Sequence, residues 1–434
     1  MKKREVFIVI LLITFGVLYN LYESGEVDIF FFDECSINPR GLVDRKHAVP
    51  FYVEENQYTG IKYLEITNPA GEVVIKKAEN NITSVKPVIR VYHKNKDKAK
   101  RIRKEIEILT REDNGKVIIG IEPEEKFPYK RVRLLFEVTV PEKVELKLYN
   151  AYGNIEITGT GKNITVNQRY GDIRVENVGS NLKIHSRHGK VSLSNISDAI
   201  DLYCRHSTLT ARSLASLKLN ASYSKISIAG VENETDIEYA AYCTVEVDNS
   251  GKFSFKGRQS RIRLNNIKNG VNIENSHNTV NMKGIHGDVR IKTRNCRING
   301  DKIVCDNLIL KNSYGNVDLS DITGKVLDIA VNNGDLDIKF NRVDGRINIK
   351  NKHSDILLDY PEAVRPMFNI NLEYGKIINR TAVEYNIIKD QQRLSVSSSE
   401  GRPEIIIINT YGDIFFRNFV PEEGEMKVEP EEFI

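Results

Sequence analysis

Four aspartates that recur close to one repeat apart could do chemistry together: Asp318, Asp335, Asp337 and Asp355. Stacked carboxylates supply the oxygen ligands that Ca²⁺ prefers, so one hypothesis is a calcium site. A pair of carboxylates also cleaves glycosidic bonds, so a second hypothesis is a polysaccharide lyase or hydrolase. However, Asp in a Gly-Asp-Ile phrase is a favoured turn residue that caps its own backbone, and no insertion in these repeats would wall a cleft. We favour turn and strand roles, with calcium next, and predict no catalytic residue.

A second series of side chains is aromatic and recurs at the starts of successive repeats. Its members are Tyr152, Tyr170, His188, His206, Tyr223 and Tyr242. Rings stacked at one corner of a repeat array would stabilise it, and outward-facing rings would bind a sugar or another partner. The series therefore predicts a packing column that doubles as a ligand-binding surface. His188 and His206 lack the further ligands that a metal site needs.

The remaining residues that could carry chemistry give little sign of an enzyme. The five cysteines, Cys35, Cys204, Cys243, Cys296 and Cys305, form no CxxC pair, so neither a zinc site nor a disulfide framework is predicted. HExxH, GxSxG and kinase motifs are missing from the sequence. The charge, 63 Lys and Arg against 59 Asp and Glu, is too balanced for a nucleic-acid partner. We predict a binding protein whose one candidate cofactor is Ca²⁺.

The elements that position these residues recur along the chain as a sequence repeat. A Tyr, a His or a polar substitute is usually followed by Gly or Ser and then by an alternating strand, with starts 17 to 21 residues apart until the last gap. The starts are Tyr152, Tyr170, His188, His206, Tyr223, Tyr242, Gln259, His277, Asn295, Tyr314, Asn333, His353, Tyr374 and Tyr411. A fixed period of this kind is typical of a solenoid. Less regular turns are expected where Gln259, Asn295 and Asn333 replace the aromatic start and where Cys243 and Cys296 replace the following Gly or Ser.

Within each repeat, apolar residues recur three, five and eight positions after the start and again near twelve and fourteen. This pattern predicts two short strands and two turns, which together make one coil. Burying about five side chains gives on the order of 10 kcal/mol, whereas ordering roughly 18 backbones costs about 18 kcal/mol, so a coil is stable only against its neighbours. In three coils the inward residues are Ile173, Val175, Val178, Leu182 and Ile184; Val191, Leu193, Ile196, Ile200 and Leu202; and Val317, Leu319, Ile322, Leu327 and Ile329. We predict an all-β solenoid (a single-stranded β-helix) of about 18-residue two-strand coils.

Segments outside the repeats are expected to protect the ends of the solenoid. Residues 51–148 contain strand-like runs without a fixed period and predict a small β-rich entry module that caps the first coil. The basic stretch HKNKDKAKRIRKE within it predicts a short helix that faces solvent, lipid headgroups or anionic wall polymer. An insertion at residues 379–403 should help to finish the last coil of the repeat region, 149–419, because open strand edges invite pairing with other chains. The acidic segment 420–434 is expected to be a disordered tail.

The repeated phrases YGNIEI, YGDIRV, HGKVSL, YGNVDL, NGDLDI, HSDILL, YGKIIN and YGDIFF carry a family resemblance. Over residues 60–419 the chain resembles the bacterial membrane-associated "putative adhesin" domains of unknown function, whose repeats read G-D/N-[IV]-x-[IV]. The resemblance implies a right-handed β-helix, an envelope location and a role in adhesion or envelope structure. It brings no catalytic residues to this sequence.

The N-terminal residues predict a membrane segment. MKKR precedes an uncharged apolar run at residues 6–22, which is long enough to cross a thin bilayer. No small-residue cleavage site follows, so an uncleaved anchor is favoured over a signal peptide that would release a secreted protein. Residues 1–22 are then a cytoplasmic stub and transmembrane anchor, residues 23–50 a linker, and the positive N-terminal flank leaves the bulk of the chain outside the cell membrane.

These features together predict a membrane-anchored, non-catalytic, adhesin-like or scaffolding surface in the cell envelope. Its expected partners are the membrane and a cell-wall polymer, glycan or envelope protein. Two alternatives remain: an envelope sensor that acts with a membrane protein, and a polysaccharide-cleaving enzyme that uses the aspartate patch. End-to-end self-assembly of the solenoids is a further hypothesis.

Overall fold

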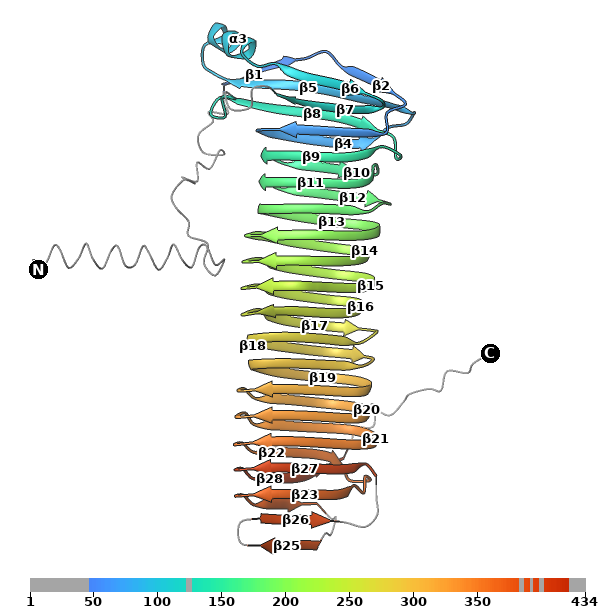
Figure 1. Ribbon diagram of the computed structural model, residues 1–434, viewed down its shortest axis with the longest axis vertical. Helices are drawn as coiled ribbons and strands as arrows, with labels where there is room; N and C mark the ends of the chain where they lie inside the picture. The colour runs from blue at the N-terminus through green and yellow to red at the C-terminus, as the bar shows by residue number, and fades with distance from the viewer. Residues whose placement is uncertain (1–46, 122–126, 382–385, 391–392, 398–401, 421–434) are drawn as a thin grey trace, which may run out of the picture.

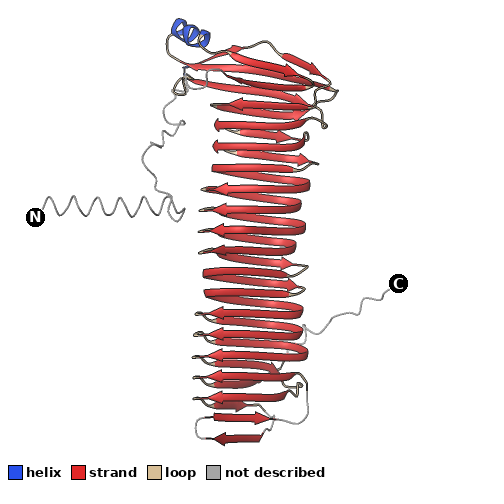
Figure 2. Ribbon diagram, viewed as in Figure 1, coloured by secondary structure: helices blue, strands red, loops and turns tan. Residues whose placement is uncertain are grey.

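A computed structural model describes residues 47–121, 127–381, 386–390, 393–397 and 402–420. Its strands lie across the long axis of a rod, with the N-terminal and C-terminal segments at opposite ends (Figure 1). Figure 2 shows that almost all the described chain is strand. The predicted transmembrane segment at residues 6–22 lies outside the described residues. Within the described ranges, no helix has the length and apolar character needed to span a bilayer.

The middle of the rod is built from strands that pair in parallel with the strand one coil further on. For example, Ile173 is in register with Val191, and Val191 with Leu209. The longer strands continue around a corner of the coil. These strands are β9 (Glu145–Tyr152), β10 (Ile155–Thr158), β11 (Lys162–Tyr170), β12 (Ile173–Val178), β13 (Leu182–Arg205), β14 (Ser207–Ser222), β15 (Lys225–Ala241), β16 (Thr244–Arg258), β17 (Arg261–Ile267), β18 (Val271–His286), β19 (Val289–Ser313), β20 (Val317–Asn332), β21 (Leu336–Lys352) and β22 (Ile356–Pro361).

Alternation of apolar and polar residues places one side of every strand inside the rod. All fifteen side chains named above as inward-facing are buried, with at most 2% of their surface exposed, so this prediction is confirmed. They belong to one hydrophobic core that runs along the whole solenoid. A column of this kind is stabilised coil by coil, as expected for a repeat array.

The N-terminal end is capped by strands that leave the stack and return to it. The first coil, β3 (Tyr63–Asn68) and β4 (Gly71–Lys77), lies between β9–β10 and a coil made by β7 (Lys116–Ile121) and β8 (Val132–Val140). Antiparallel strands and one helix then cover that outer coil. They are β1 (Ala48–Tyr52), β2 (Asn56–Thr59), β5 (Ile82–Tyr92), β6 (Ile108–Asp113) and α3 (Lys96–Lys104). Residues 63–77 and 145–148, assigned above to the entry module, are therefore part of the ladder because their apolar alternation matches that of the coils.

The C-terminal end repeats this arrangement. After β23 (Met367–Glu373) and β24 (Ile377–Arg380), the chain forms an antiparallel hairpin from β25 (Asn386–Asp390) and β26 (Arg393–Ser397). β26 pairs with β23 and so covers the last coil, as predicted for the insertion. The final coil in sequence, β27 (Glu404–Thr410) and β28 (Ile414–Phe419), lies between β21–β22 and β23–β24 and pairs in parallel with both. The last strands of the chain are therefore held between two other coils at the C-terminal end of the rod.

From His206 onward the residue that starts each repeat has a left-handed backbone conformation, whereas in the coils that start at Tyr152, Tyr170 and His188 the positive φ is that of the following glycine. The prediction of irregular turns at Gln259, Asn295 and Asn333 is wrong, because their φ angles of 50°, 54° and 53° match the 51° of Tyr223. The left-handed conformation, rather than the aromatic ring, is what this position needs, and Asn adopts it more readily than most residues. Cys243 is also a regular substitute, since its Sγ contacts the carbonyl of Ala241 at 3.3 Å, in the way that serine hydroxyls donate at other corners.

Candidate functional site

Aromatic side chains at one corner of successive coils form a continuous stack. Neighbouring ring centroids are 4.9 to 5.2 Å apart and the planes lie within 13° of each other. The members of this corner column are Tyr152, Tyr170, His188, His206, Tyr223 and Tyr242, so the predicted stacking is confirmed. Tyr129 packs edge-on against one end at 5.8 Å, and the Arg258 guanidinium lies 5.9 Å from the ring centroid at the other end. Because ring faces are covered by neighbours, the corner column presents ring edges to solvent.

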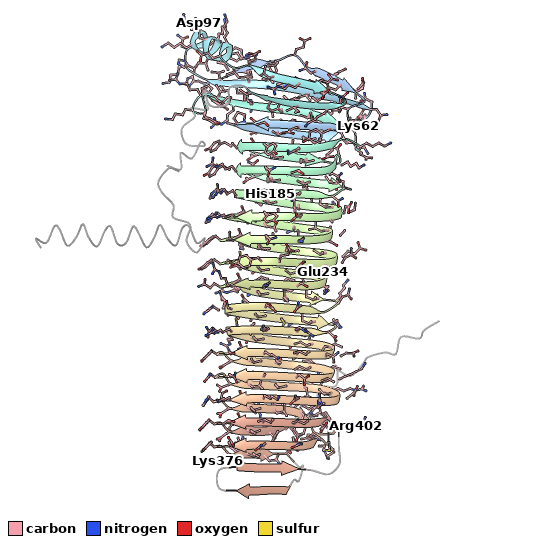
Figure 3. The ribbon with its side chains drawn as sticks, viewed as in Figure 1. Lys62, Asp97, His185, Glu234, Lys376 and Arg402 are labelled. Carbon is pink, nitrogen blue, oxygen red and sulfur yellow. The ribbon has the colours of Figure 1, made fainter. Side chains whose placement is uncertain are left out.

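A second column of outward-facing side chains lies three residues before each corner residue. Its members are Tyr149, Asn167, His185, Tyr203, Asn220 and Tyr239. His185 and Tyr203 stack with centroids 4.7 Å apart and planes within 5°, and Figure 3 places His185 in the N-terminal half of the rod. None of these residues is among the site residues predicted from the sequence. The signal of this column is a Tyr, His or Asn at a constant offset of three residues before each corner aromatic.

Three arginines also recur at a constant offset, and they lie between the two columns. Arg169, Arg187 and Arg205 each come directly before a corner residue, in three successive coils. The second column and these arginines line an open pocket of about 630 Å³ that crosses β3, β9, β11, β13, β14 and β15, which we call the groove; no residue of the corner column belongs to its lining. Its remaining lining residues are small or polar: Thr67, Asn68, Asn150, Ala151, Gln168, Ser186, Cys204, Ala221 and Ser222.

The electrostatics of the groove favour an anionic ligand. Three arginines and one histidine line it, together with neutral side chains, and no Asp or Glu belongs to the lining. Burial, with a further contribution from Lys183, lowers the pKa of His185, so this ring is neutral at pH 7. Two residues before His185 and Tyr203, the side chains of Lys183 and Asp201 form an ion pair of 3.6 Å beside the groove. Negative charge is therefore neutralised beside the groove and is missing within it.

Buried amides beneath the corner hold the turns in place. Asn312 is 2% exposed; its Nδ2 donates to the carbonyls of Cys296 and Gly315 at 2.8 Å each, and its Oδ1 accepts from the Thr293 hydroxyl at 2.9 Å. Equivalent amides at other corners also donate to backbone carbonyls. They are Asn68, Asn150, Gln168, Asn275, Asn351 and Asn409. The phrases NAYG, NSYG and NTYG signal this ladder, which sequence reasoning overlooked.

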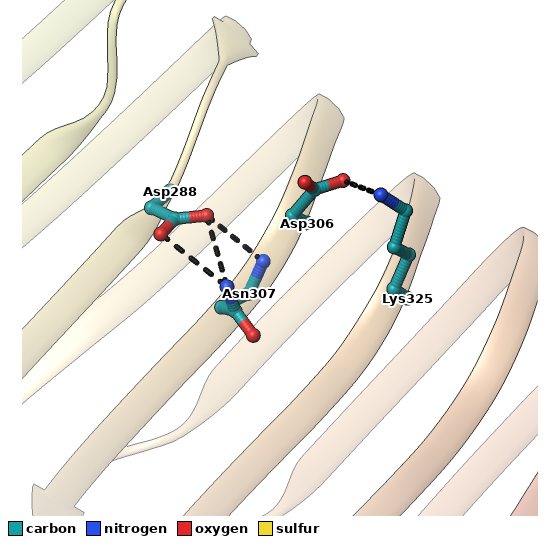
Figure 4. Close-up of polar contacts among 4 residues, drawn as sticks. All are labelled: Asp288, Asp306, Asn307 and Lys325. Carbon is teal, nitrogen blue, oxygen red and sulfur yellow. Dashed lines mark hydrogen bonds and ion pairs between the residues drawn. The ribbon is translucent and has the colours of Figure 1, made fainter.

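The four aspartates proposed as a site have two different roles. Asp335 Oδ1 accepts the backbone N–H of Asp355 at 3.4 Å, and Asp355 Oδ1 accepts that of Asp413 at 2.8 Å. Figure 4 shows the same role at Asp288, whose carboxylate accepts the Asn307 N–H at 3.0 Å, next to an Asp306–Lys325 ion pair of 2.9 Å. These aspartates do cap backbone N–H groups, but the prediction that each caps its own backbone is wrong, because the capped N–H belongs to the neighbouring coil.

Asp318 and Asp337, by contrast, are in register on neighbouring strands. Burial, followed by the charges of Asp318 and Asp359, raises the pKa of Asp337, while Arg417 acts in the opposite direction. In the part of the chain that the structure describes, no group of three or more His, Cys, Asp or Glu side chains is placed to hold a metal ion. The four predicted calcium ligands are therefore not brought together, because two of them are directed to backbone N–H groups.

The structure also places four of the cysteines and the predicted basic helix. Cys204, Cys243, Cys296 and Cys305 are free thiols inside the rod, and Cys35 lies outside the described residues. The predicted short helix is confirmed as α3, and its N-cap Asn95 accepts the N–H groups of the next turn at 2.8 and 3.1 Å. Its lysines are exposed and lie at the N-terminal end of the rod.

Comparison with known proteins identifies one family. The family model described as Toastrack DUF4097 matches residues 61–256 and, in a second overlapping match, residues 208–416. A search of curated proteins gives no match.

Three crystal structures resemble the chain at low similarity. One is described as a putative cell adhesion protein from Clostridium sporogenes, at 10% identity, 86% coverage of this chain, 100% of that chain and a TM-score of 0.17. A putative adhesin from Bacteroides fragilis and a putative lipid binding protein from Parabacteroides distasonis each give 10% identity, 86% coverage of this chain, 98% of theirs and a TM-score of 0.17.

Proposed function

The chain belongs to the Toastrack DUF4097 family, and we propose that it is a non-catalytic, adhesin-like protein whose β-solenoid binds an extended polymer of the cell envelope. The observation that carries this proposal is the groove, which crosses several successive coils instead of forming a closed pocket. A ligand that fits it is elongated along the rod and makes repeated contacts with equivalent side chains. We also propose that the chain is one of the membrane-associated "putative adhesin" domains and that its coil is right-handed.

The chemistry of the groove supports binding rather than catalysis. Its lining holds no carboxylate, so it has no acid–base pair of the kind that glycosidases use. The aspartate patch considered as an enzyme site directs two of its four carboxylates to backbone N–H groups of neighbouring coils. Both features are those of a scaffold that presents a fixed surface.

The N-terminal residues would place this surface outside the cell. We propose that residues 6–22 form a single-pass anchor with a cytoplasmic N-terminus, with secretion after cleavage as the alternative. The exposed lysines of α3 lie at the end of the rod nearest this segment in sequence, where anionic headgroups would attract them. The groove begins only a few coils away and would lie close to the membrane surface.

The test is a binding array of envelope polymers probed with the full-length protein and two tyrosine variants. Tyr203 lines the groove and is 41% exposed, whereas Tyr314 is a corner residue outside the lining and is 52% exposed. We expect saturable binding that Tyr203→Ala weakens and Tyr314→Ala leaves unchanged. Equal losses from both variants, or binding to none of the polymers, would contradict the proposal.

A further inference from the structure

The column that contains His185 is interrupted in a way that creates a subsite. His185 and Tyr203 stack on each other, so their inner faces are covered and their outer faces point along the rod. The outer face of His185 is directed toward Asn167, the residue in register in the preceding coil, whose side chain is short. Tyr149 is in register on the far side of Asn167. Two coils at about 4.8 Å each therefore separate Tyr149 from His185, which leaves room for a sugar ring above the amide.

The charge beside this gap is positive on the corner side. Arg169 and Arg187 are the groove arginines of the strands that carry Asn167 and His185. Arg187 is exposed and makes no ion pair with any residue that the structure describes. Like charges on neighbouring strands repel one another, so an anion bound between them would be favoured. A guanidinium also matches the two oxygens of a carboxylate.

From these two observations we infer that the groove takes a linear acidic polysaccharide. One sugar ring lies over Asn167 against the free face of His185, the amide contacts its hydroxyls, and Arg187 binds its carboxylate. The polymer continues along the groove past Tyr203 and Arg205. This inference rests on the proposed function and specifies the class of polymer that the same groove would bind.

The geometry favours a sugar acid over other polymers. A neutral glycan would leave the Arg187 guanidinium, which makes no ion pair with a described residue, without an anion, and a nucleic acid needs a wider basic surface than a chain of net charge +4 offers. The corner column cannot supply stacking platforms for bases, since neighbouring rings cover its faces. Sugar rings that bear carboxylates use both features of the groove together.

The test compares two forms of one polymer with the full-length protein in detergent. Polygalacturonate carries a carboxylate on each sugar, and its methyl ester has the same backbone without the charge. We expect polygalacturonate to bind with an affinity that falls as salt rises, and Arg187→Gln to weaken it about tenfold through loss of a charge-assisted contact. Arg294→Gln is the matched control, because Arg294 also precedes a corner residue and is exposed but lies outside the groove.

The outcomes separate this inference from the proposed function. Equal binding of acid and ester, with Arg187→Gln unchanged, would overturn the acidic specificity and leave polymer binding in place. Tighter binding of a thymidine oligonucleotide than of polygalacturonate would overturn it in favour of a nucleic-acid partner. Failure of both polymers, and of every polymer in the array, would overturn the proposed function as well. His185→Ala must weaken polygalacturonate binding, since the sugar packs on that ring.

Discussion

Replacing Gly171 by alanine should destabilise the first coils, because the corner there depends on close backbone approach. Gly171 has φ +134°, and a Cβ on it would lie 1.8 Å from the carbonyl oxygen of Gly153. The backbones would have to separate and so weaken the 2.9 Å bond from Gly153 N–H to Tyr170 O and the 3.0 Å bond from Gly171 N–H to His188 O. Two hydrogen bonds at about 1 kcal/mol each, with about 1–3 kcal/mol of backbone strain, predict a loss of roughly 3–5 kcal/mol.

The matched control is Gly179→Ala. Its added Cβ would meet nothing closer than the Ser197 hydroxyl at 3.4 Å, so the change should be neutral or slightly stabilising. Urea unfolding followed by circular dichroism gives the two stabilities, and hydrogen exchange of β11–β13 locates the effect. Equal unfolding midpoints and equal exchange for the two variants would refute the assignment of Gly171 as a backbone contact.

Two further predictions concern titratable groups inside the rod. Burial raises the pKa of Cys204 and of Cys305 to about 12, so a thiol reagent at pH 8 should label neither in the folded protein and both in urea; labelling of the native protein would show that these thiols are accessible. The raised pKa of Asp337 means that ionising it costs stability, and this cost is absent below the ordinary aspartate pKa of about 3.9 and present at pH 7. Asp337→Asn should therefore be more stable than the parent at pH 7 and equal to it near pH 3, and a stability difference independent of pH would contradict the assignment.

The coil pattern could be predicted from the sequence because each inward position repeats the same physical requirement. Ile173, Val191 and Val317 occupy equivalent places in their repeats, and all three are buried. The order of coils at the two ends could not be predicted in this way. β27–β28 has the same apolar alternation as any coil, and only its pairing with both β21–β22 and β23–β24 shows that it is inserted.

The binding site was harder to predict from the sequence, because the aromatic residues that recur most regularly cover one another's ring faces by stacking. The tyrosines of the corner column are the most regular signal, yet their faces contact one another. The groove depends instead on Asn167, whose short side chain interrupts the second column. It also depends on arginines that look like ordinary surface charges in the sequence and that only the pairing of neighbouring coils brings together. Such features depend on the register between coils, which a single repeat does not contain.

The most direct test of polymer binding in the groove is side-chain footprinting by hydroxyl radicals. The full-length protein would be labelled with and without the polymer that binds most tightly in the array. The account predicts protection of His185 and Tyr203, which line the groove, and unchanged labelling of Tyr314 and Tyr374, which are 52% and 47% exposed outside it. Protection of Tyr314 or Tyr374 with none at His185 and Tyr203 would contradict it.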